Sequence, residues 1–147
     1  MTSTANGVLA PLRPTSGGFI LGGMTVRVLI VDDQEPFREV ARVVTEASDG
    51  FEVVGQAETG AAAVRLARGL NPDLVLMDVN LPDMSGTVAT DQILTHDSAI
   101  VVLLVSTYEE ADYAPQAAEC GAAGYISKSV FSPQRLADAW ASATGHA

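Results

Sequence analysis

One stretch of the chain constrains the fold more than any other: LVLMDVNLPDMSG, residues 74–86. Its apolar residues from Leu74 to Met77 run without a polar alternate and end on the carboxylate of Asp78. Such a strand is covered on both faces, as in a parallel sheet with helices on each side. Pro82 lacks the N–H that a sheet interior requires, so the chain leaves the sheet after Asp78. Because open α/β sheets hold ligands at the carboxyl ends of their strands, Asp78 is a candidate functional residue.

A second apolar run, VRVLIVDDQEP at residues 26–36, also ends on carboxylates, those of Asp32 and Asp33. If the two strands are neighbours, three carboxylates meet at one edge of the sheet. Like charges at that distance raise one another's pKa and destabilise the fold unless a cation lies between them. The pattern therefore predicts a hard divalent cation, most simply Mg²⁺. The alternative is that Asp32 and Asp33 merely cap the following helix.

The composition limits the classes of partner. The chain of 147 residues has the size of one domain with a real core. Its net charge of -10 and its eight scattered basic residues oppose a direct nucleic-acid or anionic-membrane surface. No stretch approaches the roughly 20 apolar residues that span a bilayer. The single cysteine, Cys120, excludes an internal disulfide and a cysteine-based zinc site, and we interpret it as a small apolar core residue.

The first 24 residues differ from the rest, because they are rich in Gly, Pro, Ser and Thr. They lack the basic start and long apolar core of a secretory signal. We predict a flexible extension over residues 1–24 and a folded domain over residues 25–147. A translation start at Met24 is an alternative explanation of the extension.

Strand patterns alternate with helical patterns through the rest of the chain. The first strand is expected from Val26 to the carboxylates Asp32 and Asp33. Further strands are expected over residues 51–57, 74–78, 99–105 and 123–126. Helices are expected over residues 35–48, 61–68, 87–94 and 115–121, and from Ser132 onward. Five alternating pairs predict an α/β fold with a doubly wound, five-stranded parallel sheet of the flavodoxin-like kind, with the second strand at its margin. In detail, the spacing predicts burial of Val40 and Val88, and a helix closed by Gly69 and the Asn71, Pro72 turn.

Every candidate polar group follows the carboxyl end of a predicted strand. The three acids follow the first and third strands, Ser106 the fourth, and Lys128 the fifth. Acids that hold a metal, a hydroxyl that donates a hydrogen bond and a lysine that supplies positive charge suit transfer of a phosphoryl group to a carboxylate. The chain has no Gly-rich phosphate loop with a Lys and Ser/Thr pair, which argues against a nucleotide triphosphatase.

Taken together, VLIVDD, LVLMDVNLPDMSG, Ser106 and GAAGYISK resemble the receiver domain of two-component response regulators, of the kind usually joined to a helix-turn-helix output domain. The resemblance extends from Val26 to about Thr144 and implies a CheY-like receiver fold. It implies that Asp78 is the phosphoacceptor for a histidine kinase or phosphotransfer protein, and that Mg²⁺ is the cofactor. It further implies the following roles: Asp33, Asp78 and the backbone carbonyl of Asn80 as metal ligands, Asp32 as assisting acid, Lys128 as phosphoryl partner, and Ser106 and Tyr125 as switch residues.

The chain departs from the family pattern at a few positions. Ser129 follows Lys128 where the family often has a proline, so we expect a trans peptide bond there. Pro115 suggests a shortened fourth helix. Asn80 and Tyr108 occupy the two positions that flank the attacking water in the family, and we predict that the Tyr108 ring slows hydrolysis of the acyl phosphate. A Tyr108→Ala variant with an unchanged dephosphorylation rate would contradict this.

The leading hypothesis is a stand-alone receiver that acts as a phosphorylation-controlled binding module, a cytoplasmic signalling domain rather than an enzyme, with an unknown downstream protein. One alternative is the receiver of a DNA-binding transcriptional regulator without its output domain. Another is a Mg²⁺-dependent phosphatase with an aspartyl nucleophile, although such enzymes usually carry a second acid where this chain has Asn80. A homodimer is left open.

Overall fold

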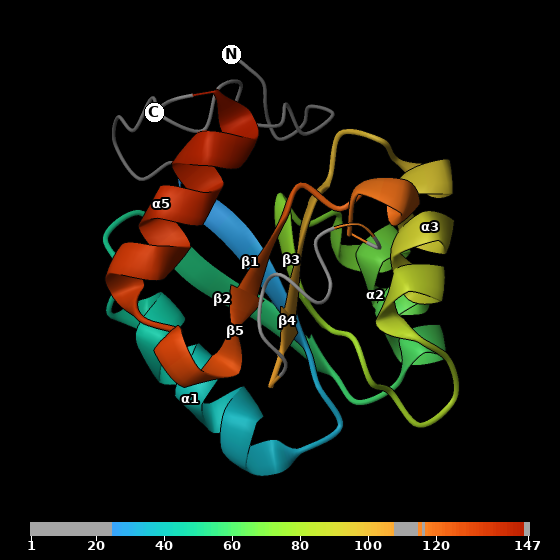
Figure 1. Ribbon diagram of the computed structural model, residues 1–147, viewed down its shortest axis with the longest axis horizontal. Helices are drawn as coiled ribbons and strands as arrows, with labels where there is room; N and C mark the ends of the chain where they lie inside the picture. Colours follow the sequence, from blue (N-terminus) through green and yellow to red (C-terminus); the bar gives the residue numbers. More distant parts are fainter. Residues whose placement is uncertain (1–24, 108–114, 116, 146–147) are drawn as a thin grey trace.

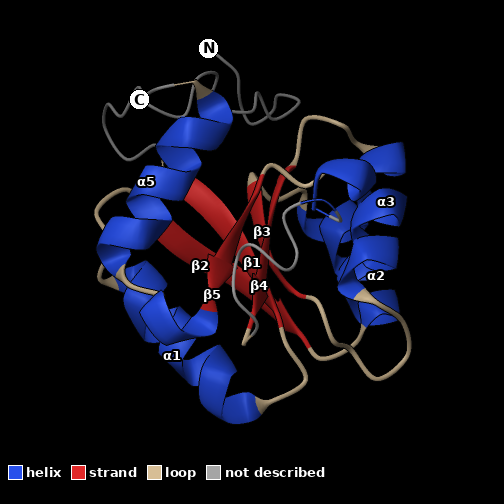
Figure 2. Ribbon diagram, in the orientation of Figure 1, coloured by secondary structure: helices blue, strands red, loops and turns tan. Residues whose placement is uncertain are grey.

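The computed structural model describes residues 25–107, 115 and 117–145. Its centre is one sheet of five parallel strands in the order β2-β1-β3-β4-β5 (Figures 1 and 2). The strands are β1 (Val26–Val31), β2 (Phe51–Ala57), β3 (Leu74–Asp78), β4 (Val101–Ser106) and β5 (Gly124–Ser127). The predicted parallel sheet and the marginal position of β2 are therefore confirmed.

Helices cover both faces of the sheet. They are α1 (Glu35–Glu46), α2 (Gly60–Leu70), α3 (Gly86–His96) and α5 (Pro133–Thr144). Figure 1 shows α1 and α5 on one side and α2 and α3 on the other. Residues 117–120 are also helical, and Gly121 follows with a φ of 91°, so the predicted end of this fourth helix is confirmed. Its predicted start falls partly outside the described residues.

The core consists of two apolar layers, one on each face of the sheet. Ala41 of α1 and Leu136 of α5 pack on one face. Ala63 and Ala67 of α2 and Ile93 of α3 pack on the other. All five residues of β3 are buried, as its unbroken apolar sequence predicts.

Local signals set where the helices begin and end. The hydroxyls of Thr59, Ser85 and Ser132 accept hydrogen bonds from backbone N–H groups in the first turns of α2, α3 and α5. The predicted start of the last helix at Ser132 and Pro133 is thereby confirmed. The predicted turn at Asn71 and Pro72 ends α2, because Asn71 is the C-cap in the left-handed conformation, with a φ of 55°. Gly69 itself does not close the helix, which continues to Leu70.

Two predicted core residues are exposed. Val40 of α1 is 47% exposed and Val88 of α3 is 46% exposed. In each helix the buried face includes a threonine instead, Thr45 in α1 and Thr90 in α3. The valine therefore lies outside the face that packs on the sheet. The Thr90 hydroxyl donates to the Gly86 carbonyl at 2.8 Å, so its burial leaves the hydroxyl bonded.

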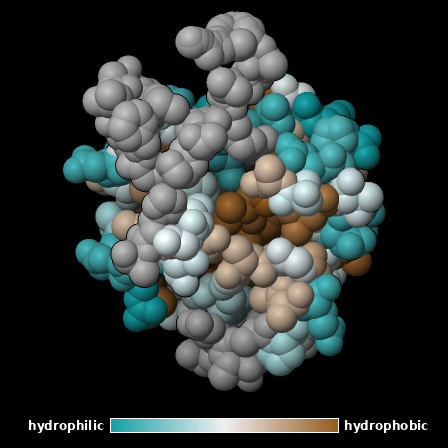
Figure 3. All heavy atoms as spheres, turned by 90° about the horizontal axis from the view of Figure 1, so that it is seen from above, coloured by the Kyte–Doolittle hydropathy of each residue, from teal (hydrophilic) through white to brown (hydrophobic). Residues whose placement is uncertain are grey.

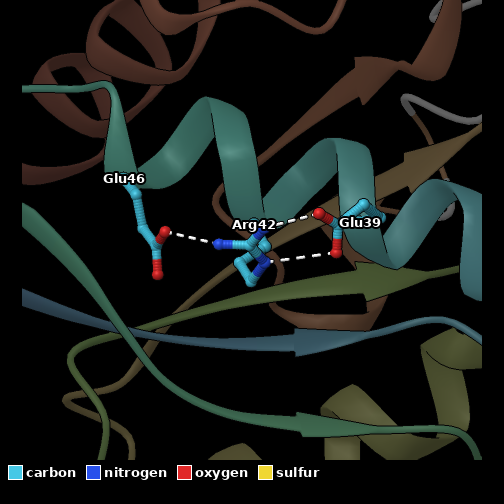
Figure 4. Close-up of polar contacts among 3 residues, drawn as sticks. All are labelled: Glu39, Arg42 and Glu46. Carbon is cyan, nitrogen blue, oxygen red and sulfur yellow. Dashed lines mark hydrogen bonds and ion pairs between the residues drawn. The ribbon is translucent and has the colours of Figure 1, made fainter.

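The outer face of α1 carries a small ionic network. Arg42 lies between Glu39 and Glu46, one helical turn away on each side (Figure 4). Its hydrogen bond lowers the pKa of the Glu39 carboxyl. Exposed pairs of this spacing contribute little to stability.

The carboxyl ends of the strands lie at the lower edge of the molecule in Figure 1, where the arrows point. Figure 3 shows the opposite end, seen from above. Hydrophilic residues occupy much of the visible rim on that side and surround a small apolar patch near the middle. The acids predicted to carry the chemistry follow the strands at the other end of the sheet.

Candidate functional site

The three acids meet as the sequence predicts. β1 and β3 are neighbours, and their register pairs Val31 with Met77, so Asp32 and Asp78 occupy adjacent positions at the same edge. Carboxylate oxygens of Asp32, Asp33 and Asp78 all lie within 4.8 Å of one another. Asp32 and Asp78 are buried and Asp33 is exposed, so the group opens to solvent on the side of Asp33.

Asp32 is held in place from several directions. It is 1% exposed, and its Oδ1 accepts a hydrogen bond from the Gln34 N–H at 2.8 Å. Its carbonyl accepts from the Arg38 guanidinium at 2.7 Å. The capping alternative is not confirmed, because the N-cap of α1 is Gln34, which makes no side-chain cap bond. The Asp32 carboxylate instead closes a local turn and turns its second oxygen, Oδ2, toward Lys128.

Lys128 brings the positive charge to the acids. Its Nζ lies 2.6 Å from Asp32 Oδ2 and 3.7 Å from Asp78 Oδ1. The lysine side chain is only 12% exposed, so these attractions act at a reduced dielectric. The lysine begins a one-turn 3-10 helix, η1 (Lys128–Val130), directly after β5. The peptide bond after Lys128 is trans, as expected for Ser129.

Burial and charge together perturb Asp78. Desolvation is the main cause that raises its pKa from 3.8 to about 6, and the neighbouring Asp32 charge adds to it. Lys128 and the Asn80 N–H, at 3.3 Å from Oδ1, lower the pKa, but by less. Burial and the Asp32 charge therefore disfavour the ionised carboxylate of Asp78, and a further cation would stabilise it.

The donors present fit a magnesium ion. Mg²⁺ prefers carboxylate and carbonyl oxygens, and the site offers three carboxylates from two strand ends. Oδ2 of Asp32 is buried and, among the described residues, accepts no hydrogen bond of good geometry, although Lys128 lies at ion-pair distance. A buried carboxylate oxygen of this kind favours a cation.

Ser106 and Tyr125 lie beside the acids on neighbouring strands. Ser106 ends β4 and is 1% exposed, and it follows the residue that pairs with Asp78. The register pairs Leu104 with Tyr125 and Ser106 with Ser127, so the alternation of side chains places Tyr125 and Ser106 on the same face. Tyr125 is 7% exposed and packs in the core layer of α2 and α3.

The loop after β3 is anchored in ways that the spacing does not reveal. The carboxylate of Asp83 accepts hydrogen bonds from the backbone N–H groups of Gly60 at 2.8 Å and Ala61 at 3.0 Å, at the start of α2. These bonds lower the pKa of Asp83. A Cβ atom at Gly86 would lie 2.1 Å from the Asp78 carbonyl oxygen, so only glycine permits this approach of α3. Asp83 lies shortly before α3 in the sequence, so its position suggests a cap for that helix. The helix that its carboxylate actually caps is α2, which comes earlier in the chain.

Phe37 of α1 has its ring centroid 4.6 Å from Lys128 Nζ, a contact that the spacing of apolar residues along the helix does not reveal. Tyr108 lies outside the described residues.

An open groove of about 620 Å³ between α2 and α3, lined by Val64, Arg65, Arg68 and Met84 among others, includes none of the three acids. Within the described part of the chain, every helix is too short or too polar to cross a bilayer.

Comparisons with known proteins agree with this geometry. A family model described as the response regulator receiver domain matches residues 28–141. The transcriptional regulatory protein YdfI of Bacillus subtilis is 44% identical over 103 residues, which are 69% of this chain and 47% of that protein. The response regulator GacA of Pseudomonas viridiflava is 40% identical over 104 residues, 70% of this chain and 48% of that protein. The chain thus spans about half the length of the curated relatives it matches.

Among solved structures, a two-component response regulator of the LuxR family from Aurantimonas sp. SI85-9A1 superposes with a TM-score of 0.75. It is 35% identical, and the match covers 82% of this chain and 86% of that one. The fold of this chain therefore has a counterpart among solved structures of response regulators.

Proposed function

The chain belongs to the response regulator receiver domain family of two-component signalling, and on that premise we propose that Asp78 is its phosphoacceptor. One observation carries the proposal: the Asp78 carboxylate is buried between a second acid and the lysine, at the end of a central strand. Asp32 is already bonded to its own turn and to Lys128, and Asp33 lies at the exposed side. Asp78 is therefore the acid best placed to react.

The proposed reaction is one transfer. A carboxylate oxygen of Asp78 attacks the phosphorus of a phosphohistidine in a kinase or phosphotransfer protein. The new P–O bond forms as the P–N bond breaks, and the imidazole leaves and takes up a proton. Lys128 Nζ, 3.7 Å from Asp78 Oδ1, is near enough to pair with an oxygen of the arriving phosphoryl group. Labelling is then stoichiometric, as suits a signalling domain rather than an enzyme.

The acids would hold Mg²⁺ beside the reacting carboxylate. We assign Asp33, Asp78 and the backbone carbonyl of Asn80 as its ligands, with Asp32 assisting. When bound, the ion neutralises negative charge on the carboxylates and on the phosphoryl oxygens. The raised pKa of Asp78 supports this assignment, because a cation would favour the ionised carboxylate that acts as nucleophile.

The proposed output is a change in packing around Ser106 and Tyr125. The Ser106 hydroxyl would move to donate a hydrogen bond to the phosphoryl group, and the Tyr125 ring would occupy the space that it leaves. Both residues project from the same face of adjacent strands, which supports a coupled movement. The surface around β5 and α5 would change and bind a downstream protein in the cytoplasm.

A second candidate concerns the whole protein. YdfI is named a transcriptional regulatory protein, and the chain matches only 47% of it. This favours a role as the receiver of a DNA-binding regulator, with DNA contacted by another domain. A full-length transcript that encodes a helix-turn-helix after the receiver would support this role, and one that ends after α5 would contradict it.

The phosphoacceptor assignment can be tested directly. Wild type, Asp78→Asn and the control Asp91→Asn are incubated with acetyl phosphate and Mg²⁺, and intact mass is recorded. Asp91 is exposed on α3, away from the three acids. We expect one phosphoryl group on wild type and on Asp91→Asn, lost when EDTA replaces Mg²⁺, and none on Asp78→Asn. A mass gain that persists in Asp78→Asn would contradict the assignment. Continued release of phosphate from phosphomonoesters would indicate a phosphatase instead.

A further inference from the structure

The ammonium of Lys128 has an aromatic neighbour as well as its two acids. The ring centroid of Phe37, on the first turn of α1, lies 4.6 Å from Nζ. That distance is within the range of a cation–π contact, in which the negative face of the ring attracts the cation. The lysine is 12% exposed, and such contacts strengthen as water is removed.

The backbone does not by itself fix where the Lys128 ammonium lies, because a long side chain separates the two. Lys128 lies on the single turn of η1, where the Ser127 hydroxyl accepts from the Ser129 N–H at a long 3.4 Å. The charge is then carried at the end of a flexible four-carbon side chain. Where the ammonium rests must be decided mainly by what it contacts: Asp32, Asp78 and the Phe37 ring.

Phe37 is itself fixed. Its ring packs against that of Phe131 with centroids 5.7 Å apart and planes at 58°, an arrangement favoured for aromatic pairs. Phe131 directly follows η1, so the ring pair joins α1 to the segment that carries the lysine. Both rings also pack on the core layer formed with α1 and α5.

We propose that Phe37 is a positioning residue that holds the Lys128 ammonium at the phosphoryl site. The ring attracts the ammonium without neutralising its charge, whereas an acid in the same place would compete with the incoming phosphoryl group. Lys128 thereby keeps its positive charge for the phosphoryl oxygens. This inference rests on the proposed function of the site, and its test is arranged so that the two fail separately.

The contact can be observed without any reaction, because Lys128 is the only lysine in the chain. Protein labelled with ¹³C-lysine gives a single set of side-chain NMR signals. The ring current of Phe37 should shift the ε-CH₂ protons upfield in wild type and in Phe37→Tyr, which keeps the aromatic face. In Phe37→Leu the signal should move to the position of an ordinary lysine. Val43→Ala, a change at an exposed position of the same helix, is the control and should retain the full upfield shift.

The consequence for function is measured by the rate of phosphorylation with acetyl phosphate at saturating Mg²⁺. Phe37→Leu should react about 2- to 30-fold more slowly than wild type, from the usual strength of cation–π contacts. Phe37→Tyr should keep most of the wild-type rate, and Val43→Ala should leave the rate unchanged. In a Lys128→Ala background, Phe37→Leu should change the rate by less than about twofold, because a residue that acts through the lysine has no further effect without it.

The outcomes separate the two proposals. If wild type is not phosphorylated, or is phosphorylated elsewhere than Asp78, the proposed function is wrong. If wild type reacts at Asp78 but Phe37→Leu reacts at the same rate, the role of Phe37 is refuted. An equal slowing by Phe37→Leu with and without Lys128 would assign Phe37 to general packing and would also refute it. Should Phe37→Leu fold poorly in urea titrations, Phe37→Met, which fills similar volume without an aromatic face, takes its place.

Discussion

Replacing Asp78 with asparagine should make the protein more stable at neutral pH when no divalent cation is present. Burial and the Asp32 charge raise the pKa of Asp78 from 3.8 to about 6 in the folded protein. Each pKa unit corresponds to about 1.4 kcal/mol, so the ionised carboxylate costs the fold roughly 3 kcal/mol above pH 6. Asparagine has a similar shape and no charge. We therefore expect Asp78→Asn to raise the free energy of unfolding by roughly 2–3 kcal/mol at pH 8.

The sign of the pH dependence follows from the raised pKa. Between pH 4 and pH 6 the folded protein holds a proton on Asp78 that the unfolded chain releases, so the stability of wild type falls as the pH rises through this window. The advantage of Asp78→Asn should accordingly be small at pH 4 and complete above pH 6. Mg²⁺ should reduce the difference in stability between Asp78→Asn and wild type, because an ion that binds only the folded wild type stabilises that protein.

Urea unfolding followed by the fluorescence of Trp140 measures this difference. With urea m-values of about 1–3 kcal/mol per molar for small proteins, the midpoint should rise by about 1 M or more at pH 8 in EDTA. Asp91→Asn is the control for loss of one exposed charge and should leave the midpoint nearly unchanged. If Asp78→Asn were no more stable than wild type at pH 8 without a cation, or if its advantage were the same at pH 4, the argument from a repulsive acid cluster would be refuted.

Three further expectations concern the scaffold that carries the site. Gly86→Ala should destabilise the fold by about 2 kcal/mol or more in urea titrations, because its Cβ would meet the Asp78 carbonyl oxygen at 2.1 Å. Gly69→Ala, where a Cβ meets no atom on α2, should instead stabilise the fold by about 0.5–1 kcal/mol. Asp83→Ala should destabilise the protein at pH 7, and the difference should vanish as the pH falls below about 4, because its lowered pKa means that the ionised form is bonded to the start of α2. Leu136→Ala, at 0% exposure, should cost about 2–5 kcal/mol, whereas Val43→Ala, 51% exposed, should stay within about 0.5 kcal/mol.

Much of the fold can be predicted from short-range patterns. The unbroken apolar run before Asp78 specifies a strand buried on both faces, and that strand is the central one of the sheet. The errors arise where a polar side chain takes a buried place. Thr45 and Thr90 are buried and Val40 and Val88 are exposed, which no ranking by hydrophobicity anticipates.

The candidate site can likewise be predicted from the sequence only in part. Strand ends in a parallel sheet share one edge, so the meeting of Asp32, Asp33 and Asp78 follows from the order of the strands. Local spacing does not say that the Asp83 carboxylate crosses to the start of α2, nor that Phe37 covers the ammonium of Lys128.

The amino-acid sequence by itself determined the alternation of strands and helices and the edge at which the acids gather, because both depend on patterns a few residues long. Only the tertiary structure decided which ring, hydroxyl or N–H group each of those side chains meets. Such contacts join residues that are distant along the chain, and their geometry depends on how the helices rotate as they pack on the sheet.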